Sequence, residues 1–451
     1  MNPSIAQALR VDSSSCIAFI GAGGKTTVLF QLARQIESPV IVTATSHIGA
    51  WQFGLADQHI MTAAATPLEE LEQDLKGIIL VTGEMDGDRS KPINDSLLNW
   101  LYQFCSYYAI PLLIEADGSR QKPLKAWSEH EPPIPPFVNQ VVQVVGLSGL
   151  GKRVSNEFVH RPEIFSKISG LEMGAAVTIQ GLTRALTHAE SGLKNIPNGA
   201  RRVMLLNQAD TQELQSAANQ MVQPLLSAFD SVIISSLEQE KIRAVHEPIA
   251  GIILAAGEST RFGQPKQLLD WRGEPFVRAV AQTALAGGLS PVVVVTGANA
   301  EKIELVFKGL DVRVVHNADW KSGQGSSIRT GIFSLTSASP LNAMERNHIG
   351  GAIFLLADQP QVTTSIIRTL TEKHAEGMYP IVAPLVMDQR ANPVLFDRFT
   401  FQDLMSIEGD MGGRAIFHKH RVEYLPWHDD RLLMDVDTPE MYQRLISDET
   451  S

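Results

Sequence analysis

The chain has 451 residues, of which 44% are hydrophobic and 19% are charged, as is usual for globular proteins. This length is long for one hydrophobic core and indicates two or three domains. Lysine and arginine number 38 against 49 aspartates and glutamates, a net charge of −11. A surface this acidic does not favour nucleic acid or an anionic membrane as a partner, although a local basic pocket for phosphates remains compatible with it.

Cysteine occurs only at Cys16 and Cys105. Two thiols so far apart do not make a disulfide framework, and their spacing is not that of a metal site. We expect both to be small buried hydrophobes in a reduced compartment. The N-terminal residues show no signal peptide and no apolar run reaches membrane-spanning length, so we expect a cytoplasmic protein.

Apolar runs alternate with helix-period segments along the first half of the chain. Runs that are apolar on both faces indicate a parallel sheet covered by helices. The Pro-rich residues 129–137 indicate a rigid loop within this domain. The predicted strands are residues 16–21, 39–45, 77–83, 110–118, 140–147, 201–210 and 230–236, and the predicted helices include residues 25–36, 94–107 and 211–229.

The first strand leads into a glycine-rich turn and then a helix, in the sequence IAFIGAGGKTTVLFQLA. Gly24, Lys25 and Thr26 match the end of a phosphate-binding loop, which offers backbone N–H groups, a lysine for phosphates and a hydroxyl for Mg²⁺. The full G-x-x-x-x-G-K-S/T pattern fails, because Phe19 stands at its first glycine, but Gly21 and Gly23 offer a different cradle. We favour a nucleotide or phosphate site over a plain tight turn.

Two later strand ends support a nucleotide site. Glu115 and Asp117 stand where the acidic residue of such a site is expected, and Asp117 is the one we select. The stretch NQAD, residues 207–210, resembles the guanine-binding N-K-x-D element of GTPases, but Gln208 replaces its lysine. Guanine specificity is therefore a weak inference, and Asp210 is equally consistent with a helix N-cap.

The first half resembles the YqeC family over most of residues 1–240. The resemblance is carried by GAGGKTT, TATSHIG, EADGSRQKPLKAW, EHEPPIP and VHRPEIF. It implies a link to the maturation of selenium-dependent molybdenum hydroxylases, without settling an activity. His47, His130 and His160 are scattered without the spacing of metal ligands, and we expect them to be structural or exposed.

Residues 235–248 are polar and end in Pro248, after which a fresh strand–helix alternation begins. We therefore predict a domain boundary near residue 245, with domains at residues 1–245 and 246–451. Both are predicted to be doubly wound α/β domains with mainly parallel sheets, the first P-loop-like and the second Rossmann-like. The strands predicted in the second half are residues 251–257, 291–297, 312–319, 350–358 and 379–386.

The stretch LAAGESTRFGQPKQLL, residues 254–269, follows the first of these strands. Gly257 and Gly263 allow close backbone approach, and exposed N–H groups of such a turn can hold an anion. Arg261 and Lys266 add fixed positive charge for the departing pyrophosphate. Such a loop is suited to a nucleoside triphosphate, whose contacts we assign to Leu254, Ala255, Ala256 and Gly257.

Acidic residues at two later positions are candidates for a cation site. Asp358 ends an apolar strand, at the edge of the sheet where ligands of open α/β sheets bind. Asp435 and Asp437 alternate in the extended stretch Asp-Val-Asp-Thr-Pro, which places both carboxylates on one side. Taken alone, Asp358 and Asp437 are equally consistent with helix N-caps.

The loop and these acidic elements resemble MobA-like nucleotidyltransferases, specifically the MocA-type cytidylyltransferase branch, over most of residues 249–445. The resemblance implies that Asp358 and Asp437 hold Mg²⁺ and that Lys266 and Arg261 contact the phosphates. It also extends to GQGSSIRTGI, residues 323–332, and SIEGDMGGRAIF, residues 406–417. Further roles that it suggests are base or ribose contacts for Ser326 and Ser327 and an acceptor-side position for Asp410 and Arg414.

The resemblance also bears on the base. The L-A-A-G form of the loop goes with CTP and L-A-G-G with GTP, so Ala256 favours cytidine. One departure is Ala391, where the family commonly has glycine before the Asn-Pro-Val-Leu-Phe stretch. If that position needs a positive φ, alanine would strain the acceptor site.

We therefore predict a CTP:molybdenum cofactor cytidylyltransferase with Mo-molybdopterin as the second substrate, fused to a domain that binds ATP or GTP. The expected partner is an apo molybdenum hydroxylase. Two alternatives stay open. The second half could act on a sugar or alditol phosphate, and the first half could be a cofactor chaperone without turnover.

Overall fold

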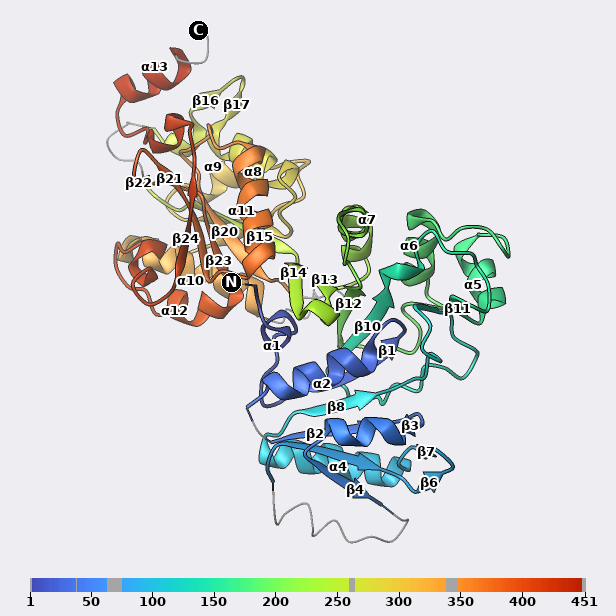
Figure 1. Ribbon diagram of the computed structural model, residues 1–451. Coiled ribbons are helices and arrows are strands. Elements are labelled where there is room, and N and C mark those ends of the chain that lie inside the picture. The colour runs from blue at the N-terminus through green and yellow to red at the C-terminus, as the bar shows by residue number, and fades with distance from the viewer. Residues whose placement is uncertain (1, 38, 63–74, 259–263, 338–347, 448–451) are drawn as a thin grey trace. The chain divides into compact units, whose positions relative to one another are not determined.

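The computed structural model describes residues 2–37, 39–62, 75–258, 264–337 and 348–447 (Figure 1). The chain divides into two compact units, Met1–His246 (unit 1) and Glu247–Ser451 (unit 2). In the described part of the chain, every helix is too short or too polar to cross a membrane.

Unit 1 is built on a nine-stranded sheet with the order β14-β13-β12-β10-β1-β8-β2-β5-β4. All neighbours pair in parallel except β13 and β14, which are antiparallel. Its strands are β1 (Cys16–Gly21), β2 (Val40–Ala44), β4 (Gln58–Met61), β5 (Ile78–Thr82), β8 (Leu112–Glu115), β10 (Gln140–Gly146), β12 (Arg201–Asn207), β13 (Ser231–Ser236) and β14 (Lys241–His246).

Helices cover both faces of this sheet because its strands are apolar on both faces. On β1, Ala18 and Ile20 share a core cluster with α4, whereas Ile17 and Phe19 point to the other face, where α2 packs against β1 and β8. A third group of helices, α5 to α7, packs against the β10, β12 and β13 end of the sheet. The helices are α1 (Ile5–Ala8), α2 (Lys25–Gln35), α4 (Asp95–Tyr108), α5 (Pro162–Ser169), α6 (Ile179–Thr187) and α7 (Gln212–Leu226).

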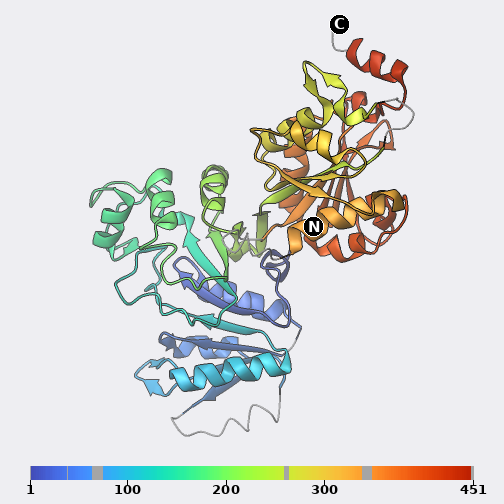
Figure 2. The ribbon, with the colours of Figure 1, turned by 180° about the vertical axis from the view of Figure 1, so that it is seen from behind.

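Unit 2, yellow to red in Figure 2, has an eight-stranded mixed sheet. β19, β18, β15 and β20 run parallel, and β23 pairs antiparallel with β20 and with β21, which in turn pairs with β22 and β24. Its strands are β15 (Ile249–Ala255), β18 (Val292–Thr296), β19 (Arg313–His316), β20 (Gly351–Leu356), β21 (Ile381–Val386), β22 (Gln389–Arg390), β23 (Val394–Asp397) and β24 (Val422–Pro426).

Two separate cores lie on the two faces of the unit 2 sheet. Alternation along β15 sends Ile253 to a core shared with α8 and α11, and Ile252 to a core shared with α10 and α12. The helices of unit 2 are α8 (Phe276–Ala286), α9 (Ala300–Leu305), α10 (Gln324–Thr336), α11 (Thr364–Gly377), α12 (Phe401–Met405) and α13 (Pro439–Ser447).

The predicted α/β class, with helices on both faces of the sheets, is confirmed. The structure adds strands that the sequence reading missed. The polar stretch 235–248 was read as a boundary segment, but it contains β14, an edge strand whose alternating polar residues hid it. The antiparallel strand β23 was also missed, and so was β24, which pairs in parallel with β21.

Candidate functional site

The candidate site of unit 2 lies where its parallel strands end. β15 ends at Ala255, β18 at Thr296 and β20 at Leu356, and the three strands are adjacent and parallel. The Ala256–Gly257 turn follows β15, and Asp358 stands two residues beyond β20. Arg261 and Gly263, predicted members of this site, lie outside the described residues.

Lys266 lies between the two predicted metal ligands. Its Nζ is 2.5 Å from Asp437 Oδ1 and 3.9 Å from Asp358 Oδ2. The lysine begins a short 3₁₀ turn, Lys266–Leu268, and the next residue, Gln267, donates through Nε2 to the Gly257 carbonyl at 2.8 Å. Three segments that are far apart in the sequence therefore meet at one ammonium group.

Packing of the residues around Asp437 fixes its position. Val436, between the two aspartates, is 1% exposed and packs in a cluster with Trp271, Phe276 and Leu445. α13 starts immediately after this segment, and the Tyr442 hydroxyl donates to the Asp270 carbonyl at 2.9 Å. Burial of the valine leaves the carboxylates on either side of it free to face the site.

Asp435 is held differently from Asp437. Its Oδ1 accepts a hydrogen bond from Gln359 Nε2 at 2.9 Å, and Gln359 follows Asp358 directly. Gln361 ties the same two segments together, because its Nε2 donates to the carbonyls of Arg431 and Met434. These amide contacts keep the loop after β20 against the segment that carries Asp437.

The electrostatics of the site suit a divalent cation. Burial raises the pKa of Asp358, Lys266 opposes this rise, and the charges of Asp435 and Asp437 add to it. Among the described residues, no three histidine, cysteine, aspartate or glutamate side chains form a metal-binding group. Two carboxylates are nevertheless the usual protein share for Mg²⁺, which takes its other ligands from water and substrate phosphates.

The two further segments singled out in unit 2 touch each other. A Cβ on Gly323, whose φ is +105°, would lie 2.3 Å from the Gly409 carbonyl carbon, and the Gly325 N–H donates to the Gly409 carbonyl at 2.9 Å. Asp410 follows Gly409 directly, and the Arg414 guanidinium donates to the Arg390 carbonyl at 3.0 Å. The start of α10 is thus packed on the loop that carries both predicted acceptor-side residues.

Ser326 and Ser327 lie at the start of α10 and are buried, at 3% and 4% exposure. The Asn317 side chain donates to both hydroxyls, at 2.8 and 3.0 Å. Their contacts with a base or ribose stay a prediction, and Asn317, which follows β19, was not among the predicted site residues. The φ of Ala391 is not positive, so alanine causes no backbone strain at this position.

In unit 1, the glycine-rich loop after β1 leaves no room for side chains. Gly21, Gly23 and Gly24 have φ values of 97°, 86° and 120°. A Cβ on Gly21 would lie 2.3 Å from the Val144 carbonyl oxygen, and a Cβ on Gly23 would lie 2.3 Å from the Gly146 backbone nitrogen. Glycine is therefore required by both conformation and space.

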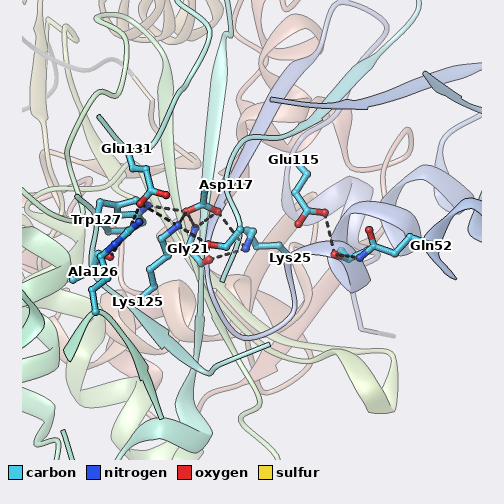
Figure 3. A network of polar contacts seen from close by, with 12 residues as sticks. Gly21, Lys25, Gln52, Glu115, Asp117, Lys125, Ala126, Trp127 and Glu131 are labelled. Atoms are coloured by element: carbon cyan, nitrogen blue, oxygen red, sulfur yellow. Dashed lines mark hydrogen bonds and ion pairs between the residues drawn. The ribbon is translucent and has the colours of Figure 1, made fainter. Parts of the chain in front are cut away.

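Lys25 and Asp117 lie together behind this loop (Figure 3). Lys25 Nζ donates to the Gly21 carbonyl at 2.7 Å and lies 3.2 Å from Asp117 Oδ1. The Gly21 N–H also donates to the Asp117 carboxylate. On the other side of the carboxylate, Lys125 Nζ lies 2.9 Å and Trp127 Nε1 lies 2.7 Å from Asp117 Oδ2.

Glu115, and not Asp117, contacts the predicted Mg²⁺-binding hydroxyl. Thr26 Oγ1 donates to Glu115 Oε2 at 3.0 Å, and Gln52 Nε2 donates to the same hydroxyl at 3.2 Å. Burial raises the pKa of Glu115, and the nearby charge of Lys25 opposes this rise. Asp117 instead pairs with Lys25 and Lys125. Glu115 and Asp117 are two residues apart, so strand alternation alone could not tell which of them contacts the hydroxyl.

The stretch NQAD, residues 207–210, which resembles a guanine-binding element, makes hydrogen bonds within the fold. Asn207 Nδ2 donates to the Gly23 carbonyl at 2.8 Å, and its Oδ1 accepts from the Leu237 N–H at 3.1 Å. Gln208 Oε1 accepts from Ser148 Oγ at 2.6 Å. Asn207 therefore supports the glycine loop. Sequence reasoning missed this role, although three glycines within four residues, Gly21, Gly23 and Gly24, signal a close neighbour.

Comparisons with known proteins divide the chain in the same way. The family model described as YqeC protein matches residues 17–163, and that described as MobA-like NTP transferase domain matches residues 251–424. YqeC of Escherichia coli (strain K12) is 34% identical over 216 residues, 46% of this chain and 82% of its own. Nicotine blue oxidoreductase of Paenarthrobacter nicotinovorans is 32% identical over 207 residues, 44% of this chain and 96% of its own.

A third relative comes from Bacillus cytotoxicus and is named "Probable molybdenum cofactor guanylyltransferase". It is 27% identical over 149 residues, 33% of this chain and 66% of its own. The extent of the two family matches and of the first two relatives leads to one conclusion. The chain belongs to the YqeC family in its N-terminal part and to the MobA-like NTP transferases in its C-terminal part, which makes it a nucleotidyltransferase.

Proposed function

We propose that unit 2 transfers the cytidylyl group of CTP to the terminal phosphate of Mo-molybdopterin, which yields the cytosine dinucleotide form of the cofactor and pyrophosphate. The observation that carries the proposal is the Lys266 ammonium between Asp358 and Asp437, beside the loop that follows β15. A relative named for molybdenum cofactor guanylyl transfer supports the acceptor class. Ala256, in the L-A-A-G form of the loop, favours CTP over GTP.

In this proposal the attacking group is a phosphate oxygen. A phosphate monoester is already anionic near neutral pH, so the step needs no general base. Lys266 donates to the phosphates of CTP and offsets the charge that develops as pyrophosphate leaves. Asp358 and Asp437 would hold Mg²⁺, which when bound supplies positive charge at the phosphates. The remaining contribution is alignment of the two substrates by the loops at the strand ends.

In this proposal Lys266 moves away from the carboxylates of Asp358 and Asp437 when a cation binds. The Lys266 ammonium is the counter-ion that the two carboxylates share, and its 2.5 Å contact with Asp437 is a charge-assisted hydrogen bond. A bound cation would replace the ammonium between the carboxylates, so that Lys266 becomes available to the phosphates. One lysine therefore serves both the empty and the loaded site.

For unit 1 we propose a nucleotide-binding accessory role in the maturation of a molybdenum hydroxylase, whose apo form would receive the cofactor. The glycine loop with Lys25 and Thr26 would take the phosphates of ATP or GTP, with Mg²⁺ at Thr26. Joining the two units in one chain would raise the effective concentration of a labile pterin between their sites. A carrier without turnover is the alternative, and phosphate release by an Asp358→Ala variant of the full chain would distinguish an NTPase from it.

The test incubates the protein with Mg²⁺, Mo-molybdopterin and each of CTP, GTP and ATP in separate samples, and identifies products by mass. A cytidylylated pterin supports the proposal. Parallel samples with sugar and alditol phosphates test the other acceptor class. Because one relative is named an oxidoreductase, another sample follows NADH and NADPH oxidation. Turnover there without nucleotidyl transfer would contradict the proposal.

A further inference from the structure

Two segments of unit 1 meet beside the glycine loop, and the proposed nucleotide site does not use their contact. β9 (Leu124–Lys125) pairs in parallel with β11 (Val159–His160), so Lys125 stands opposite His160. The Ala126 N–H donates to the His160 carbonyl at 3.0 Å and extends the pairing. The pairing brings EADGSRQKPLKAW and VHRPEIF, two of the segments that carry the YqeC resemblance, to one place.

Positive charge exceeds negative charge where these segments meet. Lys125 Nζ lies 2.9 Å from Asp117 Oδ2 and 3.6 Å from Glu131 Oε2, and Arg161 also pairs with Glu131. Lys25 also pairs with the Asp117 carboxylate. Three cations therefore share two carboxylates, and the Lys125 side chain is only 1% exposed.

Arg120 adds a further positive charge. It is exposed, and no acidic side chain in the described part of the chain pairs with it. Burial together with the charges of Arg161, Lys125 and Arg120 lowers the pKa of His160 to about 4, with Glu131 acting in the opposite direction. The imidazole is therefore neutral near pH 7, and the three cations contribute to its low pKa.

The backbone of the same segments is held in a conformation that large side chains rarely adopt. Arg120, Gln121 and Arg161 have φ values of 53°, 60° and 63°. Non-glycine residues in this region cost roughly 1 kcal/mol or more each, and such residues concentrate at ligand sites. The fold thus keeps both arginines in place at a cost to stability.

The Asp117 carboxylate separates the cations into two groups (Figure 3). Its Oδ1 faces Lys25 and its Oδ2 faces Lys125 and Trp127, while the Gly21 N–H donates to both oxygens. A nucleotide phosphate held by the loop would lie on the Lys25 side. An anion on the Lys125 side would be a different group, because a negative carboxylate stands between the two positions.

We propose that Arg120, Lys125, His160 and Arg161 form a second anion site in unit 1, which binds the phosphate group of a phosphate monoester distinct from the nucleotide. The inference deepens the proposed accessory role of unit 1 and rests on it for the identity of the ligand. Mo-molybdopterin carries such a phosphate, so the site would hold the cofactor by its phosphate while the glycine loop holds the nucleotide. The neutral imidazole can donate to a phosphate oxygen, and the guanidinium groups can bind it bidentately.

The test is calorimetric titration of inorganic phosphate into the full chain saturated with Mg²⁺, with a non-hydrolysable ATP or GTP analogue and with CTP, which occupies the proposed phosphate contacts of unit 2. We expect one phosphate site, weakened about tenfold or more by Arg120→Gln, the scale of one lost hydrogen bond from a charged group. Arg153→Gln is the matched control, since Arg153 is also an exposed arginine of unit 1 outside the cluster. His160→Gln provides a second variant if Arg120→Gln does not fold.

A spectroscopic readout separates this site from a general charge effect. Bound phosphate offsets the surrounding cations, so the pKa of His160 should rise from about 4 when phosphate is added, as seen by NMR of its ring. Absence of phosphate binding, equal weakening in Arg153→Gln, or an unshifted His160 would overturn the proposal.

A Lys25→Ala variant distinguishes failure of this inference from failure of the nucleotide site. If phosphate still binds to this variant with the affinity of the parent protein, the second site stands whether or not nucleotide binds. If phosphate binding disappears together with nucleotide binding, phosphate occupies the glycine loop and the second site does not exist.

Discussion

Lys266 shows how the chemistry of unit 2 depends on single side chains. It contacts Asp437 at 2.5 Å and lies 3.9 Å from Asp358, so the two predicted metal ligands share one counter-ion. Asp358→Ala and Asp437→Ala should each lower nucleotidyl transfer by about 100-fold or more, the scale of losing a main electrostatic contributor. Steady-state rates with saturating Mg²⁺ measure this, and Asp311→Ala at an exposed aspartate is the control.

The double variant tests whether both aspartates act through one ion. The loss in Asp358→Ala/Asp437→Ala should be little larger than in either single variant, because one missing ligand already removes the cation. The Asp437 side chain is 54% exposed, so we expect its loss to change the free energy of unfolding by less than about 1 kcal/mol. Early melting with retained transfer would assign that aspartate to a structural cap.

The pH dependence of cation binding gives a second prediction at the residue scale. Burial raises the pKa of Asp358 above the ordinary value of 3.8, and the charge of Asp437 raises it further. Mn²⁺ binding followed by EPR should therefore weaken, as pH falls, with a midpoint above 3.8. Asp435→Asn should move this midpoint to lower pH, because the charge of Asp435 also raises the pKa of Asp358 and Asp435 is not one of the two proposed ligands. A midpoint at or below 3.8 in the parent protein would contradict the proposed site.

The same shift has a stability consequence of known sign. Asp358 holds a proton more tightly in the folded than in the unfolded protein, so its contribution to stability is present below the unfolded pKa. This contribution is lost as pH rises from 3.8 through the raised folded pKa. In Asp358→Asn this loss should be absent, which chemical denaturation at several pH values can measure.

At the scale of elements, the contact between α10 and the loop before Gly413–Ile416 decides the shape of the proposed acceptor side. Gly323→Ala would place a Cβ 2.3 Å from Gly409, at a φ of +105°. We expect a loss of more than about 2 kcal/mol in the free energy of unfolding and weaker transfer, because two backbones must separate. Gly309→Ala is the control. It has a φ of +84° but open space, so it should cost about 1 kcal/mol.

A normal melting temperature in Gly323→Ala would show that these loops are not held together in solution. If Gly309→Ala lowered the free energy of unfolding as much, the whole effect would come from the positive φ and not from the contact with Gly409. Transfer activity separates the two residues further, since Gly309 lies outside the loops at the strand ends.

Some strands could be predicted from the sequence and others could not. β1, β10 and β18 are buried on both faces, and their continuous apolar runs predicted them within a residue or two. β14 was missed because it is an edge strand with exposed or partly exposed polar residues, whose pattern resembles that of a linker. Antiparallel β23 lies beside β20 through a pairing that no local pattern encodes.

The candidate sites were predictable to a similar extent. Strand ends and spacing made Asp358 and Asp437 candidates, and the resemblance to MobA-like nucleotidyltransferases selected them together with Lys266. The structure brings these three residues together. The contacts of Lys125 and Asn207 depend on packing between distant segments, so the sequence offered only their motifs.

For the whole molecule, we propose separate nucleotide sites in the two units. Lys25→Ala should abolish binding of ATP or GTP at unit 1 and leave cytidylyl transfer at the parent rate, because the Lys25 ammonium contacts Gly21 and Asp117, both of unit 1. Calorimetry with the Asp358→Ala background isolates binding at unit 1, and Lys167→Ala at an exposed lysine of α5 is the control. Unchanged binding would mean that the glycine loop is only a turn.

The central claim is that the molecule cytidylylates the phosphate of a molybdenum-bearing pterin. The most direct measurement gives the full chain Mo-molybdopterin and Mg²⁺ with CTP and GTP at equal concentration in one sample, and identifies the product by mass. We expect the cytosine dinucleotide as the main product, with release of pyrophosphate. A guanylylated pterin as the main product would contradict the assignment of CTP, and an unmodified pterin would contradict the proposed acceptor.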